Sequence, residues 1–187
     1  MNPRSKQFLQ WTSFMVLALV VGYAGIRAGG ALRARNAPPL AEAPDFPFMP
    51  GDVFPDVLLA DSLGAGVGSI ELVSGRGGAV VLFLDPTCEG CAEMATRWER
   101  AVYDGVIEPG RVFGITAETA AENARYRAGH GLSYPIYQDV EAAFLVRYGV
   151  DTYPMEIVVN RMGTVQAVST DSRTPIDGGS IRALIDN

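Results

Sequence analysis

The sequence predicts an α/β protein with a mixed sheet, and three observations support this fold class. From residue 51 onward, extended and helical patterns alternate, as they do where parallel strands are joined by helices. Residues 79–84 are a continuous apolar run, typical of a central strand buried on both faces. Two later extended stretches are separated only by Arg161-Met162-Gly163, which predicts an antiparallel hairpin near the end of the sheet.

The length and charge of the chain limit the classes of function. The 187 residues are enough for one domain of roughly 130–140 residues and an additional segment. A net charge of −6 gives no basic footprint, so we expect no nucleic-acid partner. Lys6 is the only lysine, which leaves no lysine in the folded domain to act as a base or to form a Schiff base.

The N-terminus begins with a charged tail and continues into an apolar stretch. Arg4 and Lys6 precede residues 8–26, which carry no charge. A membrane-spanning helix needs about 20 mostly apolar residues, whereas a cleaved signal has a shorter apolar region followed by a small-x-small site. Gly22-Tyr23-Ala24 resembles such a site, but apolar character continues to Ile26. We therefore expect residues 1–26 to be a tail and an uncleaved anchor, with a cleaved signal as the alternative and a buried core helix disfavoured.

The flanking charges do not decide the orientation of this segment, since arginines follow it as well as precede it. The short N-terminal tail favours a cytoplasmic N-terminus. The two cysteines described below favour an oxidising compartment for the C-terminal domain. We expect a single-pass protein of the cytoplasmic membrane whose domain lies in the periplasm or another extracytoplasmic space.

Residues 27–50 have the composition of a linker rich in proline and alanine, and such segments run extended. Phe46 and Phe48 are the two residues in it that could instead pack on the domain. We place the folded domain at residues 51–187.

Within the domain, each element is predicted from its own pattern. Strands at 53–60 and 69–74, around the glycine-rich residues 61–68, form a hairpin-like entry. The remaining predicted strands are residues 79–84, 111–116, 134–138, 155–160 and 164–170. The predicted helices are residues 92–101, residues 117–128 stopped by Gly129, residues 140–148 and residues 178–186.

The motif Cys88-Glu89-Gly90-Cys91 lies at the turn between the apolar strand and the first long helix. We expect Cys88 at the helix N-terminus, where the macrodipole and free N–H groups stabilise a thiolate and lower its pKa. Cys91 follows one turn later on the same side, from where it can resolve a mixed disulfide formed at Cys88. This arrangement indicates redox chemistry.

Two other uses of the cysteines are disfavoured. A zinc site needs about four ligands, whereas the chain offers two cysteines and the single His130, so we expect no metal. A purely structural disulfide would close so short a loop that its entropic contribution to stability would be small.

Three segments together resemble the thioredoxin-like superfamily. The apolar strand, the Cys-x-x-Cys motif and the following helix are similar to the thioredoxin active-site unit. Residues 147–165, which contain Gly149-Val150 and Pro154, are similar to the segment that carries the cis-proline and the last hairpin. Residues 51–74 and 134–139 resemble the additional elements of membrane-anchored TlpA/ResA-type proteins.

The resemblance implies a thioredoxin-like fold and a thiol–disulfide oxidoreductase with catalytic Cys88 and Cys91 and no cofactor. It also implies a cis peptide bond before Pro154, which would face the cysteines. Tyr153 would then present its backbone to an extended client chain. The implied partners are client proteins with cysteine pairs and a membrane electron donor or acceptor for recycling.

The sequence departs from the usual pattern at three places. Leu84 and Thr87 stand where tryptophans are usual, and Pro86-Thr87-Cys88 resembles the MauD-type proteins of methylamine dehydrogenase maturation. Thioredoxin has a buried acid six residues before the first cysteine, where this chain has Leu82. The candidate proton acceptors for Cys91, each expected to be an exposed carboxylate, are Glu89, Asp85 and Glu156.

Two alternative functions remain. A peroxiredoxin needs Pro-x-x-x-Thr/Ser-x-x-Cys, but this chain has Val81 and Asp85 at the Pro and Thr positions, so we disfavour it. A non-catalytic tethered chaperone or maturation factor with the same fold is the second alternative. Whether the protein reduces or oxidises its clients depends on a potential that the motif does not determine.

Overall fold

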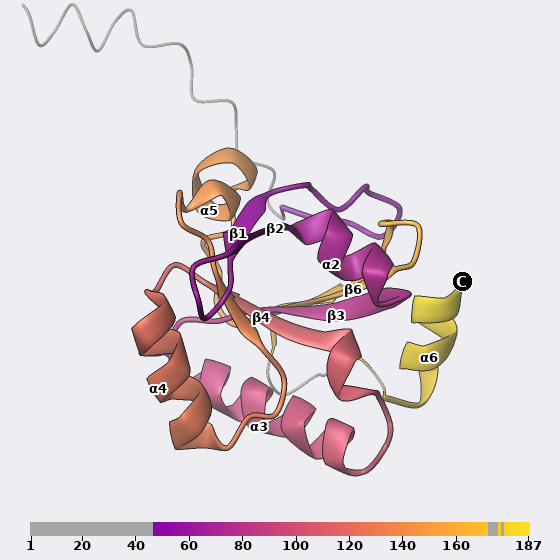
Figure 1. The fold of residues 1–187 in the computed structure, drawn as a ribbon. Coiled ribbons are helices and arrows are strands. Elements are labelled where there is room, and N and C mark those ends of the chain that lie inside the picture. Colours follow the sequence, from indigo (N-terminus) through magenta and orange to yellow (C-terminus); the bar gives the residue numbers. More distant parts are fainter. Residues whose placement is uncertain (1–46, 172–175, 177) are drawn as a thin grey trace, which may run out of the picture. The chain divides into compact units, whose positions relative to one another are not determined.

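The computed structural model describes residues 47–171, 176 and 178–187. Its sheet has seven strands in the order β2-β1-β5-β4-β3-β6-β7 (Figure 1). Strands β3, β4 and β5 are parallel, and the other pairs are antiparallel, which confirms the predicted mixed sheet. The strands are β1 (Leu58–Ala60), β2 (Gly66–Gly68), β3 (Gly78–Phe83), β4 (Val112–Thr116), β5 (Ile136–Gln138), β6 (Met155–Asn160) and β7 (Val165–Ser169).

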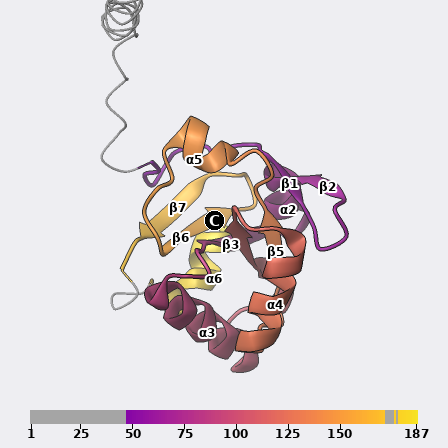
Figure 2. The same cartoon turned by 90° about the vertical axis from the view of Figure 1, so that its left-hand side faces the viewer.

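Helices cover both faces of this sheet (Figures 1 and 2). Helices α3 (Glu89–Tyr103), α4 (Ala120–His130) and α6 (Gly178–Asp186) contribute side chains to one apolar cluster. Helices α2 (Ser69–Gly75) and α5 (Ala143–Tyr148) contribute to the cluster on the opposite face. A short 3-10 helix, η1 (Pro109–Arg111), precedes β4. The domain is therefore a three-layer α/β structure.

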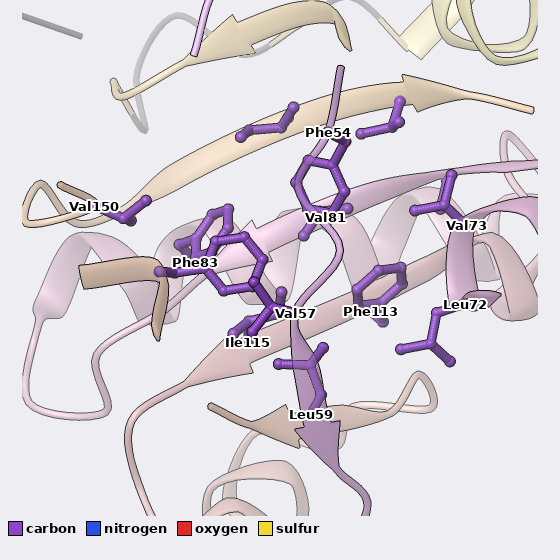
Figure 3. Close-up of a cluster of buried hydrophobic side chains, with 14 of the residues drawn as sticks. Phe54, Val57, Leu59, Leu72, Val73, Val81, Phe83, Phe113, Ile115 and Val150 are labelled. Carbon is purple, nitrogen blue, oxygen red and sulfur yellow. The ribbon is translucent and has the colours of Figure 1, made fainter. Parts of the chain in front are cut away.

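The central strand β3 supplies both clusters. Val81 and Phe83 belong to the cluster on the α2/α5 face (Figure 3). Phe83 packs edge-on against Phe144, with 4.9 Å between ring centroids. Val80 and Leu82 point to the α3 face. Successive strand side chains alternate between faces, so burial on both sides explains why this segment is apolar at every position.

Phe48 lies within the predicted linker but packs on the domain. Its side chain is 3% exposed, and its ring lies 5.9 Å from that of Phe54 and 6.3 Å from that of Phe83. The packed domain therefore starts before residue 51. Phe46 lies outside the described residues.

The predicted strand at residues 69–74 is wrong, because these residues form helix α2. Its buried residues are Ser69, Leu72 and Val73, a helical spacing. The Ser69 hydroxyl donates to the carbonyl of Pro55 (2.6 Å) and accepts from the amide of Val57 (2.9 Å). These bonds tie the helix start to the chain before β1. The antiparallel partner of β1 is β2, inside the glycine-rich segment.

The starts of two other helices shift because polar side chains accept hydrogen bonds from their first amides. Thr119 caps α4 through a reciprocal capping box with Glu122, so the helix starts after the predicted residue 117. It continues through Gly129 and ends at Gly131, whose φ of +64° suits glycine. Asp139 accepts the first amides of α5, which places the start of that helix at Ala143.

Among residues 47–171, 176 and 178–187, no helix is long and apolar enough to cross a membrane. The expected anchor at residues 8–26 and most of the expected linker lie outside the described part of the chain.

Candidate active site

Cys88 is the N-cap of α3. Its Sγ accepts a hydrogen bond from the amide of Cys91 (3.2 Å), one of the amides left free at a helix start. Its own amide donates to the carbonyl of Asp85 (3.0 Å), which closes the turn that leads from β3 into the helix. The half-buried Cys88 therefore presents its sulfur at the end of the helix, as its position in the sequence predicted.

Cys91 lies one turn further and is fully buried, with 0% exposure. Its Sγ accepts a hydrogen bond from the Asp85 amide (3.4 Å). Burial raises the pKa of the Cys91 thiol to about 12; Cys88 and the charge of Asp85 also raise it, whereas the Asp85 amide lowers it. Both cysteines are free thiols in this structure. The pair is therefore asymmetric, with an accessible sulfur at Cys88 and a buried, protonated one at Cys91.

The Tyr153–Pro154 peptide bond is cis, as the resemblance implied. Phe83 pairs with Met155, so the preceding Pro154 lies beside the chain that leads from β3 to the cysteines. Tyr153 is half-buried and packs against both apolar clusters. Burial is the main cause that raises the pKa of Tyr153, followed by the charge of Asp85, and Cys91 is a smaller cause. The fold thus brings two distant segments to one end of the sheet.

The three candidate proton acceptors have different surroundings. Glu89 is exposed, as expected. Asp85 is half-buried, and its carboxylate accepts hydrogen bonds from the amide and the hydroxyl of Thr87, both at 2.7 Å. Glu156 is fully buried, so the expectation of an exposed carboxylate is wrong. Of these three, Asp85 is the one whose charge acts on Cys91.

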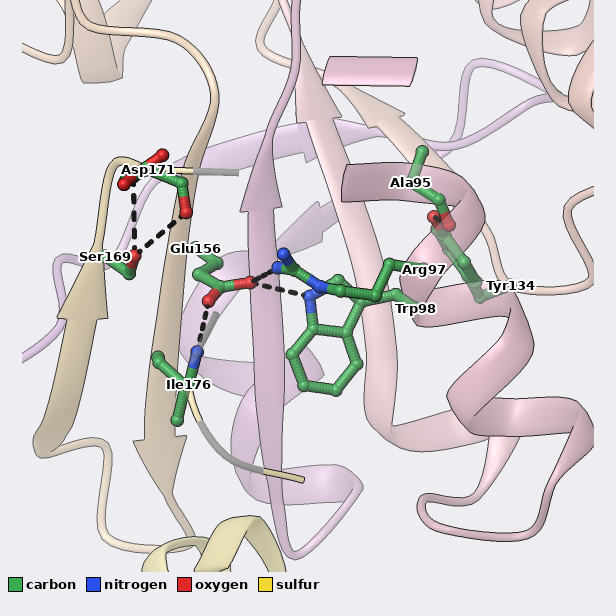
Figure 4. A network of polar contacts seen from close by, with 8 residues as sticks. All are labelled: Ala95, Arg97, Trp98, Tyr134, Glu156, Ser169, Asp171 and Ile176. Atoms are coloured by element: carbon green, nitrogen blue, oxygen red, sulfur yellow. Dashed lines mark hydrogen bonds and ion pairs between the residues drawn. The ribbon is translucent and has the colours of Figure 1, made fainter. Parts of the chain in front are cut away.

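Glu156 is buried because its strand places it under α3. Its carboxylate forms an ion pair with Arg97 and accepts from Trp98 Nε1 (2.8 Å) and from the amide of Ile176 (2.8 Å), as Figure 4 shows. The indole of Trp98, which packs in the cluster on the α3 face, thus also donates a hydrogen bond. These bonds join α3, β6 and the chain before α6, so the carboxylate supports the helix that carries the cysteines.

The family of the chain follows from its sequence match. The model of the AhpC/TSA family matches residues 50–168, which is most of the domain described above. The chain belongs to the AhpC/TSA family. No curated protein matches it.

Solved structures show the same fold for this AhpC/TSA chain. A protein from Chlorobium tepidum described as a thiol:disulfide interchange protein DsbE has 17% identity and a TM-score of 0.58, covering 73% of this chain and 95% of its own. Peroxidoxin BcpB from Mycobacterium tuberculosis has 20% identity and a TM-score of 0.54, covering 72% and 93%. A thiol peroxidase from Chromobacterium violaceum has 20% identity and a TM-score of 0.56, covering 73% and 85%. These neighbours share the fold of this chain, and both disulfide and peroxide chemistry occur among their names.

Local residues distinguish this AhpC/TSA site from the peroxiredoxin pattern. Val81, at the expected proline position, is fully buried within β3 and points to the α2/α5 face. Asp85, at the expected threonine position, uses its carboxylate to hold the turn at Thr87. The two thiols, three residues apart, are reactive groups of this site.

Proposed function

We propose that the protein is a thiol–disulfide oxidoreductase in which Cys88 is the nucleophile and Cys91 is the resolving thiol. The observation that carries this proposal is the asymmetry of the pair: Cys88 caps α3, whereas Cys91 has 0% exposure. A nucleophile must reach the client, and a resolving thiol must be held beside the nucleophile.

In the reducing direction, the Cys88 thiolate attacks one sulfur of a client disulfide. A bond forms between Cys88 and that sulfur, and the other client sulfur leaves as a thiolate. Cys91 then loses its proton and attacks Cys88, so the client leaves as a dithiol and the pair becomes a disulfide. The oxidising direction reverses these steps. Asp85 is the proton acceptor that we propose for Cys91, because its charge acts on that thiol.

The client would lie along the segment before β6. The cis Tyr153–Pro154 bond supports this, because it directly precedes Met155, which pairs with Phe83 at the strand end that leads to Cys88. An extended client segment could pair there with the backbone of Tyr153, and main-chain hydrogen bonds would give affinity with little dependence on sequence.

Single serine variants test the mechanism. We expect Cys88→Ser to abolish reduction of a protein disulfide, and Cys91→Ser to accumulate a mixed disulfide at Cys88 that mass spectrometry detects. Equilibration with glutathione gives the potential and thereby the direction of electron flow. Full biological activity of Cys88→Ser would instead support a non-catalytic chaperone or maturation factor. Turnover of hydrogen peroxide by Cys91→Ser would support a peroxidase.

We also propose that residues 1–26 anchor the protein in the cytoplasmic membrane with the domain outside. Clients would then be extracytoplasmic proteins with cysteine pairs, with MauD-like maturation of a periplasmic redox protein as one case. A membrane electron donor or acceptor would recycle the pair. Fractionation with membranes and an N-terminus at Met1 are expected, whereas a mature N-terminus near Gly25 would show that a signal had been removed.

A further inference from the structure

Tyr126 on α4 carries a buried hydroxyl without a hydrogen-bond partner among the described residues. Its side chain is 8% exposed. Such groups are rare, because a buried hydroxyl left unpaired loses its hydrogen bonds to water without replacement. Tyr134, in the same apolar cluster, shows the usual arrangement, since its hydroxyl donates to the carbonyl of Ala95 (2.9 Å). The free hydroxyl of Tyr126 therefore needs an explanation.

The position of Tyr126 in the fold relates its hydroxyl to the cysteine pair. It belongs to the apolar cluster that contains Cys91 and against which Cys88 packs. Helix α4 lies alongside α3, the helix that carries both cysteines (Figure 2). His130, one turn further along α4, also contacts Tyr126, with 4.5 Å between the two ring centroids. The tyrosine is thus buried in the same cluster as the redox pair.

The surroundings of Tyr126 keep its hydroxyl protonated. Burial raises the pKa of Tyr126 to about 12, and negative charge on Cys91, Cys88 and Asp85 adds to this effect. Burial also raises the pKa of Tyr134, and negative charge on Tyr126 would add to that effect. At neutral pH, Tyr126 is therefore a neutral hydroxyl whose proton is free to turn toward a new anion.

We propose that Tyr126 is a positioning residue for resolution, in which its free hydroxyl stabilises the Cys91 thiolate as that thiolate forms. The proposal rests on the thiol–disulfide function proposed above. Cys91 is buried and has to lose a proton before it can attack Cys88. A hydroxyl that already has a partner would have to give it up, whereas the Tyr126 hydroxyl has none to lose. Hydrogen bonds to an ionised partner are also about twice as strong as neutral ones.

The step conserves atoms and electrons. The Cys91 proton passes to the acceptor, and the resulting thiolate forms a bond to Cys88 Sγ. The bond between Cys88 and the client sulfur breaks, its electron pair leaves with the client, and that sulfur takes a proton from solvent. Tyr126 keeps its own proton throughout and contributes only the hydrogen bond.

The test uses the full-length protein with Cys88 joined to thionitrobenzoate, a coloured leaving group. Attack by Cys91 releases the colour at a rate that can be followed from pH 6 to pH 9. We expect Tyr126→Phe to release it about tenfold more slowly than the wild type, as loss of one hydrogen bond to a charged group implies. We also expect its stability to denaturant to be equal or higher, because the unpaired hydroxyl is gone. The matched control Tyr134→Phe loses a satisfied hydrogen bond, so it should be less stable but resolve at the wild-type rate.

The outcomes separate this proposal from the one on which it rests. If the wild type releases no colour, Cys91 does not resolve and both proposals fail. If the wild type releases colour and Tyr126→Phe matches its rate at every pH, only the role of Tyr126 is overturned. Slow release together with a loss of stability as large as that of Tyr134→Phe would show a structural role and would also overturn the proposal.

Discussion

Leu82 of β3 and Glu156 of β6 lie directly opposite each other in the antiparallel pair, and both side chains point to the face covered by α3. Leu82 occupies the position at which thioredoxin has its buried acid. In this protein a buried carboxylate is present on the neighbouring strand instead, and it is held by Arg97, Trp98 and the amide of Ile176. The partners of the carboxylate under the active-site helix therefore give it a structural role.

This network predicts the effect of Glu156→Gln. We expect it to lower the free energy of unfolding by about 2–3 kcal/mol, because an amide NH₂ would face a group that now donates to a carboxylate oxygen. Denaturant unfolding measures the change. Glu89→Gln is the matched control on an exposed position and should change stability by less than about 0.5 kcal/mol. Equal stability of the two variants would contradict the network.

The different burial of the two thiols predicts unequal alkylation. In the reduced protein at neutral pH, iodoacetamide should modify Cys88 at least about tenfold faster than Cys91, because the thiolate is the reactive form and burial keeps Cys91 protonated. Peptide mapping by mass spectrometry after a time course measures both rates. In the denatured protein the two rates should converge, and similar rates in the folded protein would count against the site geometry.

The sequence predicted best the elements whose patterns are local and strong. The apolar run of β3, the start of α3 at Cys88 and the bounds of β6 and α6 depend on neighbouring residues alone. Residues 69–74 were predicted wrongly because a short apolar segment can fit a strand or a helix, and the bonds of Ser69 to Pro55 and Val57 decide between them. Those bonds connect residues more than ten positions apart and leave no local signal.

The candidate site was likewise predictable where its residues form a local pattern, and not where they depend on packing between distant segments. Cys88 and Cys91 form one short motif, and Pro154 was located by resemblance. The burial of Glu156 depends on which strand lies beside β3, and the free hydroxyl of Tyr126 depends on how α4 packs against α3. Neither relationship is encoded in a spacing along the chain. A tyrosine on an amphipathic helix gives the same pattern as an ordinary core residue.

The hydrogen bonds of Asp139 to the start of α5 predict that this residue stabilises the helix. Its 5% exposed side chain accepts from the amides of Ala143 and Phe144, both at 2.8 Å. We expect Asp139→Ala to lower the free energy of unfolding by about 1–2 kcal/mol, because two amides at the start of α5 lose their acceptor, as they do when a capping side chain is removed. Hydrogen exchange of the α5 amides should also become faster. Glu141→Ala is the control, since it removes only an exposed ion pair with Arg147 and should have almost no effect on either measurement.

The raised pKa of Cys91 predicts how stability changes in alkaline solution. Its ordinary value is 9.0 and its folded value is about 12, so the folded state favours the protonated thiol. Below pH 9 the Cys91 thiol is protonated in both the folded and the unfolded state, so its full contribution to stability is present. Between pH 9 and pH 12 the unfolded state releases its proton first, so the free energy of unfolding falls as pH rises, by up to about 1.4 kcal/mol per pH unit.

Two variants isolate this effect from the buried tyrosines, which also titrate in alkaline solution. Cys88→Ser retains Cys91 as the only thiol, and the double variant Cys88→Ser/Cys91→Ser has none, whereas both keep Tyr126 and Tyr134. Urea unfolding at intervals from pH 7 to pH 10.5 should give parallel curves up to about pH 8.5. Above that pH the stability of Cys88→Ser should fall more steeply than that of the double variant. Curves that stay parallel throughout would mean that Cys91 has the same pKa in the folded and unfolded chain. The proposal that Cys91 is a buried resolving thiol would then have to be abandoned.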